Sequence, residues 1–210
     1  MNFKKIIQQY NASIMNTKQY ITAITYIILL RITDLGLTFI YTPYLRYEWN
    51  PIVSIFNYSW IGMLITQILI ISLIIAVMSF YFNKKPITGL PNDLSFNEYI
   101  YYYFHNERKV KKRKFLKPTR QIINRVLAYN GFILMTLSIS ISYLAIINNL
   151  MVIYKVRSYS NFIGRYGNSF YITILIILAI LSFILFFIME YSLYRKNLAE
   201  VTIYDKKLEK

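Results

Sequence analysis

Residues 60–82, WIGMLITQILIISLIIAVMSFYF, form a run of apolar and uncharged polar residues without a single charged side chain. A helix of this length rises about 35 Å, which is enough to cross the hydrocarbon core of a bilayer, about 30 Å thick. Three further apolar runs occupy residues 21–41, 131–154 and 170–191. A backbone surrounded by lipid must satisfy its own hydrogen bonds, so each run is predicted to be a helix. The sequence therefore predicts an all-α fold: an integral membrane four-helix bundle.

The basic residues are distributed unevenly around these runs. Three precede the first run, eleven lie between the second and third runs, and five follow the fourth, whereas four lie in the two remaining connections. Loops rich in Lys and Arg stay in the cytoplasm. Both termini and the long middle connection are therefore predicted to be cytoplasmic, and we expect the membrane to be a bacterial inner membrane.

Five segments follow from this topology. They are a basic N-terminal arm (1–20), spans one and two with an outer turn (21–83), a basic, Tyr-rich cytosolic loop (84–130), spans three and four (131–192) and a cytosolic tail (193–210). Within the loop, Ser95 and Glu98 have the spacing of a capping box that begins a helix. Thr119 is a candidate N-cap for a second helix that leads into span three. The loop is therefore predicted to be a helical hairpin.

The first apolar run contains two charged residues, Arg31 and Asp34. With Thr38 they share one helix face, so the two charges are predicted to pair. A charge at the centre of a membrane helix costs about 2.5–3.5 kcal/mol on insertion scales, and such residues usually face the bundle interior. Gln67 in span two is a candidate neighbour.

Two more polar residues, Glu48 and Asn50, follow that run. Asn50 precedes Pro51, and because Pro suits the first position of a helix, Asn50 is a candidate N-cap. Two readings of this polar intramembrane cluster stay open. It is either an ion pair and a cap that fix how spans one and two meet, or an outward-facing polar cavity. Its predicted members are Arg31, Asp34, Thr38, Glu48, Asn50 and Gln67.

The pattern Asp34-x-x-x-Thr38 followed by Glu48-x-Asn50-Pro51 resembles a family of small uncharacterised prokaryotic multi-pass membrane proteins. That family has a D-x-x-x-T first span and an E-x-N-P outer turn. The resemblance covers about residues 28–56. It implies a fold of about four spans and no particular reaction.

The composition argues against several kinds of chemistry. The chain has no Cys, so disulfides, thiolate metal sites and a Cys nucleophile are excluded. The one His, His105, lies across the predicted membrane from Asp34 and Glu48. No nucleophile–base pair is visible in the sequence. We therefore predict no catalytic residues, no metal and no cofactor, and favour a non-enzymatic protein.

A basic run in the middle loop is the candidate binding segment. It can bind anionic lipid headgroups, nucleic-acid phosphates or an acidic protein. The residues predicted to bind a partner or lipid are Arg108, Lys109, Lys111, Lys112, Arg113, Lys114 and Lys117.

From this segment we predict a multi-pass membrane accessory or regulatory protein. It would dock a cytosolic protein or ribonucleoprotein, for example an RNA-targeting CRISPR effector. The sequence is compatible with either a monomer or an oligomer. The alternative is an intramembrane enzyme or transporter with an outward polar cavity around Asp34 and Glu48.

Overall fold

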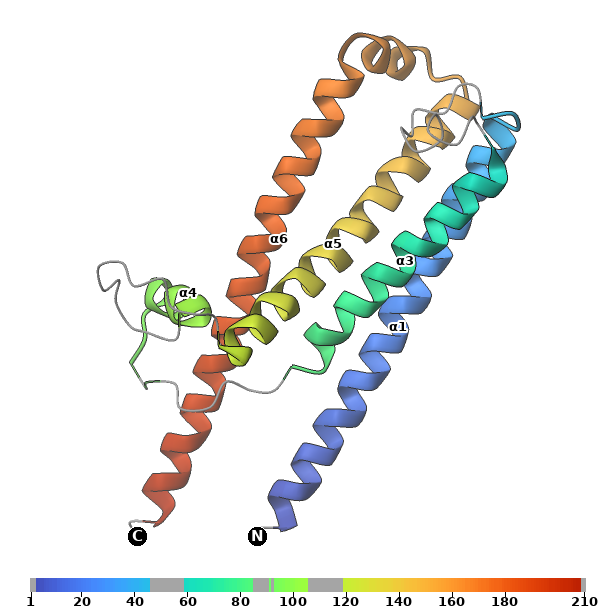
Figure 1. The fold of residues 1–210 in the computed structure, drawn as a ribbon. Coiled ribbons are helices and arrows are strands. Elements are labelled where there is room, and N and C mark those ends of the chain that lie inside the picture. The colour runs from blue at the N-terminus through green and yellow to red at the C-terminus, as the bar shows by residue number, and fades with distance from the viewer. Residues whose placement is uncertain (1–2, 46–58, 85–90, 92, 106–118, 209–210) are drawn as a thin grey trace.

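The computed structural model describes residues 3–45, 59–84, 91, 93–105 and 119–208. Five helices are defined there: α1 (Phe3–Tyr41), α3 (Trp60–Phe82), α4 (Phe96–His105), α5 (Arg120–Ile153) and α6 (Arg157–Leu208). The described residues contain no β-strand. The all-α prediction is confirmed (Figure 1).

Each of the four long helices contains a segment long and apolar enough to cross a membrane. These segments are Thr17–Tyr41, Trp60–Phe82, Arg120–Ile153 and Arg165–Lys196. They contain the four apolar runs, apart from one residue at the end of the third. The helices extend beyond the runs, however: α1 begins at Phe3, so the predicted N-terminal arm is continuous with the first span. Hydropathy detects the apolar part of a helix, whereas caps and polar turns decide where the helix begins.

Helices α1, α3 and α5 pack together, and α6 packs against α5 (Figure 1). Both chain termini and α4 lie at one end of the bundle, here called the terminal end. The opposite end holds the turn after α1 and the short connection from α5 to α6. This arrangement agrees with an even number of crossings.

The backbones of α3 and α5 approach closely at Gly131. A Cβ atom at this position would lie 2.5 Å from the Val77 carbonyl oxygen and 3.1 Å from Met78 Cα. Only glycine permits this approach without a shift of the backbone. Nearby, Ile27, Ile74 and Met78 form a buried apolar cluster that joins α1 and α3 to α5.

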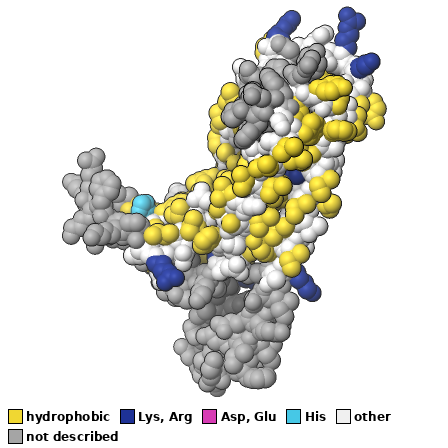
Figure 2. All heavy atoms as spheres, turned by 45° about the vertical axis from the view of Figure 1, so that its right-hand side comes forward, with side chains coloured by type: hydrophobic (Ala, Val, Ile, Leu, Met, Phe, Trp, Pro, Cys, Tyr) yellow, Lys and Arg dark blue, Asp and Glu magenta, His cyan; other side chains and the backbone are white. Residues whose placement is uncertain are grey.

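The surface of the long helices is strongly apolar. On α6, Ile172, Ile176, Ile180, Ile184 and Ile188 recur every four residues, and each is 43–58% exposed. Figure 2 shows hydrophobic side chains over the long helices and most of the visible Lys and Arg near the two ends. Soluble monomers rarely expose apolar patches of this extent. The surface is the kind that a lipid-facing bundle presents.

Local capping explains several helix boundaries. The Ser95 amide and hydroxyl both donate to Glu98 Oε2, at 2.9 and 2.8 Å, so the predicted capping box is confirmed. Thr119 Oγ1 accepts from the Ile122 amide at 3.4 Å, as predicted. Helix α5 runs from this cap to Ile153.

Helix α5 ends in a Schellman motif. The Val156 amide donates to the Met151 carbonyl, and Lys155 adopts a left-handed conformation with φ of 53°. Three residues separate α5 from α6.

Candidate functional site

A polar layer crosses the bundle between α1, α3 and α5. It is formed by Arg31, Asp34 and Thr38 of α1, Gln67 of α3 and Asn149 of α5. Arg31 Nη1 lies 3.5 Å from Asp34 Oδ2, so the predicted pair is present. Both side chains are 14% exposed. Thr38 and Gln67 are also buried, which places the four described residues of the predicted cluster inside the bundle.

Asn149 is the member that the sequence did not reveal. Its Nδ2 donates to Asp34 Oδ1 at 3.2 Å and to Thr38 Oγ1 at 3.1 Å. One amide thus bridges the acidic residue and the hydroxyl across the α1–α5 interface. The available signal was the Asn148–Asn149 doublet within an apolar run, because polar amides are costly in lipid unless they are bonded.

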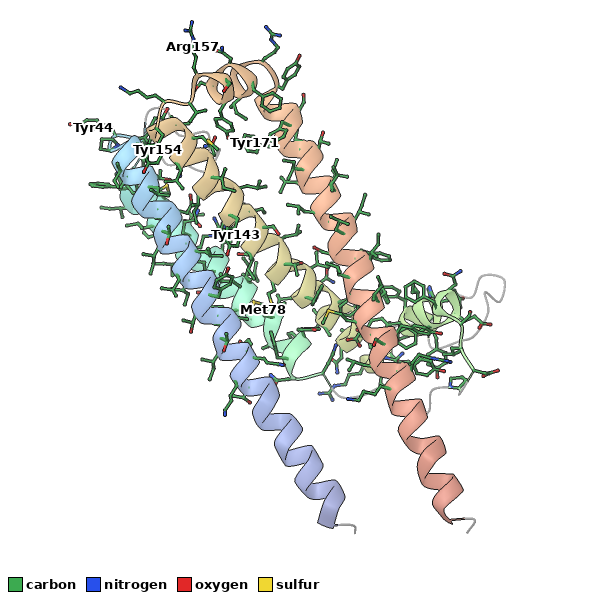
Figure 3. All side chains as sticks on the ribbon, turned by 180° about the vertical axis from the view of Figure 1, so that it is seen from behind. Tyr44, Met78, Tyr143, Tyr154, Arg157 and Tyr171 are labelled. Carbon is green, nitrogen blue, oxygen red and sulfur yellow. The ribbon has the colours of Figure 1, made fainter. Side chains whose placement is uncertain are left out.

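The adjacent Asn148 has a different role. Its Oδ1 accepts hydrogen bonds from the hydroxyls of Tyr159 and Tyr171, both at 2.8 Å. Figure 3 shows Tyr171 on α6 near the end of α5. This contact fixes the start of α6 at the opposite end of the bundle.

The polar layer lies between two apolar clusters. Toward the terminal end is the cluster of Ile27, Ile74 and Met78. Toward the opposite end, Leu45 and Met63 are fully or almost fully buried and pack with Leu35 and Trp60. The predicted members Glu48 and Asn50 lie outside the described residues.

The second candidate site is at the terminal end, where α4 packs on α5 and α6. We call this the aromatic platform; its buried residues are Leu94, Tyr99, Tyr103, Phe132, Phe186, Phe187 and Tyr194. The Tyr194 hydroxyl donates to the Pro91 carbonyl at 2.6 Å and accepts from the Leu94 amide at 3.1 Å. Burial raises the pKa of the Tyr99 and Tyr103 hydroxyls.

Arg125 of α5 holds the last turn of α4. Its Nη1 donates to the Tyr102 and Tyr103 carbonyls, both at 3.3 Å. In return the Tyr103 hydroxyl donates to the Arg125 carbonyl at 3.1 Å. A cation at a helix C-terminus satisfies carbonyls that lack partners within the helix. The end of α4 is therefore fixed against the beginning of α5.

A partly buried ion pair joins the platform to α3. Lys84, two residues after α3, pairs with Glu190 of α6, and its Nζ lies 4.3 Å from the centre of the Tyr81 ring. Burial lowers the pKa of Lys84, while the Glu190 carboxylate opposes that shift. Neither residue was a predicted site residue, because 106 positions separate them and no local spacing links them.

The predicted basic binding residues, Arg108 to Lys117, lie outside the described residues. They fall between the end of α4, which packs in the platform, and the cap of α5. Among the described residues, no group of three His, Cys, Asp or Glu side chains is positioned to hold a metal ion.

Comparison with protein-family models, curated proteins and solved structures finds no match. The resemblance over residues 28–56 therefore stays a prediction.

Proposed function

We propose that this protein is a non-enzymatic, multi-pass membrane protein that presents a cationic loop to an anionic cytosolic partner. The terminal end would face the cytoplasm of a bacterial cell. The partner would be an acidic protein or a ribonucleoprotein, held at the membrane rather than chemically altered.

The observation that carries this proposal is the reciprocal bonding of Arg125 with Tyr102 and Tyr103. It joins the two helices that flank residues 106–118 on the packed end of the bundle. A segment attached at both ends to packed helices loses less conformational entropy on binding than one attached at one end. Because its flanking helices are fixed to each other, the segment is suited to dock a partner.

The charge of the segment defines the partner. Residues 106–118 contain seven Lys or Arg and one Glu. Such a segment attracts phosphate or carboxylate groups, with an affinity that falls steeply as salt rises. The charge distribution along the chain supports a cytoplasmic position for this loop.

The polar layer, by contrast, has the geometry of a hydrogen-bond network that holds α1 and α5 together. Asp34 is bonded to both Arg31 and Asn149, and Thr38 accepts from the same amide. The alternative, an enzyme or transporter, would need these side chains to act on a substrate.

One experiment separates the two functions. The full-length protein in nanodiscs is used to capture partners from cell extract at low and high salt. A variant with Lys111, Lys112, Arg113 and Lys114 changed to Gln is compared with Asp34→Asn. We expect salt-sensitive capture that the loop variant loses and D34N keeps. Capture that survives loop neutralisation, or that a folded D34N variant loses, contradicts the proposal.

Orientation is tested separately. Single Cys residues introduced near residue 112 should react with a membrane-impermeant maleimide in inverted vesicles and not in intact spheroplasts. The native chain has no Cys, so its background is nil. The opposite labelling pattern would place the loop outside the cell and refute a cytosolic partner.

A further inference from the structure

Three buried polar atoms in the middle of the bundle have no hydrogen-bond partner among the described residues. They are Arg31 Nε, Gln67 Oε1 and Ser138 Oγ. Gln67 is 8% exposed and Ser138 is 3% exposed. A buried polar group without a partner costs about 1–3 kcal/mol, and native proteins rarely leave three together.

Two close contacts set the relative heights of the helices. Gly131 of α5 lies against Met78 of α3, and Asn149 of α5 bonds Thr38 of α1. Moving eleven residues along α5 from Gly131 reaches Ser142. Moving eleven residues back along α3, which is antiparallel to α5, from Met78 reaches Gln67. From the second contact, moving seven residues back along α5 from Asn149 reaches Ser142. Moving seven residues back along α1 from Thr38 reaches Arg31.

Seven and eleven residues are close to two and three whole helical turns. Arg31, Gln67 and Ser142 therefore lie at one height and on the faces that meet. Ser138 is one turn closer to the terminal end on the same face of α5. The burial pattern agrees, because Gln67 shares its face of α3 with the buried Met63, Ile74 and Met78.

We propose that the polar layer encloses water, with at least one molecule that accepts from Arg31 Nε and donates to Gln67 Oε1. The unpartnered groups are a donor, an acceptor and a hydroxyl that can act as either, which matches the two donors and two acceptors of water. A buried water typically makes about three hydrogen bonds. The Ser142 hydroxyl is not available as a donor, because it donates to the Ser138 carbonyl at 2.8 Å.

Water fits this layer better than an ion does. The charges of Arg31 and Asp34 offset each other, so an added ion would leave a net charge at the centre of the bundle. The Ile27–Ile74–Met78 and Leu45–Met63 clusters lie on either side. The site is therefore an enclosed water site and not a segment of an open pore.

The direct test is water-edited solid-state NMR on the full-length protein in lipid bilayers. Magnetisation from water should reach Arg31 Nε and the Gln67 side-chain amide. The methyl groups of Ile27 and Ile74, which lie toward the terminal end, should receive little. If Arg31 and Gln67 remain as poorly polarised as the two Ile methyl groups, the layer is dry and the proposal is wrong.

A second test uses the sign of a stability change. Gln67→Met keeps the length of the side chain and removes the acceptor. If water bridges Gln67 to Arg31, the substitution breaks the bridge and lowers the folded-to-unfolded ratio about fivefold. If Gln67 Oε1 is unbonded, the substitution removes a buried acceptor that has no hydrogen-bond partner. The folded-to-unfolded ratio then rises, and that result overturns the proposal.

The matched control is Thr66→Val, on the same helix. The Thr66 hydroxyl donates to the Gly62 carbonyl of its own helix at 2.9 Å, so its loss leaves the layer intact. Its effect on the folded-to-unfolded ratio should be smaller than that of Q67M. Should Q67M not fold, the NMR measurement on the wild-type protein decides the question alone.

Discussion

Two ion pairs in the described part of the chain, Arg31–Asp34 and Lys84–Glu190, differ in almost every respect. The first joins residues three positions apart on one helix and receives a hydrogen bond from another helix. The second joins residues more than a hundred positions apart and lies among aromatic rings at the terminal end. Arg31 and Asp34 are held side by side by the helix itself, whereas Lys84 and Glu190 meet only when α3 and α6 are in place.

This difference shows what each pair contributes. A local pair lowers the cost of placing charge in a span and does little to choose among packings. A long-range pair at a helix end is formed only in the native arrangement and so reports on it. At the terminal end, the Lys84–Glu190 pair therefore depends on the tertiary arrangement of α3 and α6.

Of the substitutions considered, Lys84→Met is expected to have the largest effect. It leaves the Glu190 carboxylate buried without its cation, and loss of one member of a buried pair costs about 3–5 kcal/mol. Arg31→Met should cost less, because Asn149 still donates to Asp34. Unfolding of purified variants in mixed micelles by titration with SDS measures both. Equal losses would show that the two pairs are equivalent.

Two further variants refine this result. The double variant K84M/E190L should regain much of the lost stability, because no charge remains buried. In Glu190→Gln the pKa of Lys84 falls further, since the attraction that opposed burial is gone. The unfolded chain then binds more protons between that lowered pKa and the ordinary Lys value, so stability should rise with pH in that window. A flat profile would mean that Lys84 is solvated.

Helix contact between the two regions depends on Gly131. Its replacement by Ala puts a methyl group 2.5 Å from the Val77 carbonyl oxygen, so α3 and α5 must separate. We expect a loss of about 1–3 kcal/mol.

The matched control is Gly36→Ala on α1, where nothing lies within 4 Å of the added Cβ. There the gain in helix propensity should stabilise the protein by about 0.5–1 kcal/mol. Thermal unfolding in detergent distinguishes the two signs; a stabilising G131A would refute the close crossing.

The polar layer is tested by Asn149→Leu. The change removes the bonds to Asp34 and Thr38 and is expected to cost about 1–3 kcal/mol. Asn130→Leu is the control, because the exposed Asn130 amide bonds only its own helix at Val126. Denaturant titration compares them. No difference between the two variants would mean that Asn149 does not tie α1 to α5.

The smallest expected effect is at Lys155, which has a left-handed backbone at the end of α5. Lys155→Gly removes the steric cost of that conformation and should stabilise the protein by about 0.5–1 kcal/mol. Lys155→Val should have the opposite sign, since a β-branched residue is disfavoured there. The ranking Gly above Lys above Val, measured by thermal unfolding, would confirm the Schellman ending.

Much of the fold follows from the sequence because its determinants are local. The apolar runs marked the four long helices, and the Ser95–Glu98 and Thr119 caps marked two helix starts. The Arg31–Asp34 pair followed from its spacing alone. Each of these features depends on residues within a few positions of one another.

The remainder depends on which faces of different helices meet. Asn149 donates to Asp34, Arg125 donates to carbonyls at the end of α4, and Glu190 pairs with Lys84. Each of these interactions joins two different elements, so no local spacing predicts it. The Tyr-rich helix was expected to form part of a basic loop, whereas two of its rings enter the core. The seven predicted partner- or lipid-binding residues stay a prediction.

The lengths of α1 and α6 have a consequence for reach. A helix of 39 residues extends about 58 Å, nearly twice the hydrocarbon thickness, and α6 is longer still. At the terminal end, α1 and α6 both continue beyond their apolar segments, which begin at Thr17 and end at Lys196 (Figure 1). In the proposed orientation the outermost turns would stand clear of the hydrocarbon core, within reach of molecules in the cytoplasm.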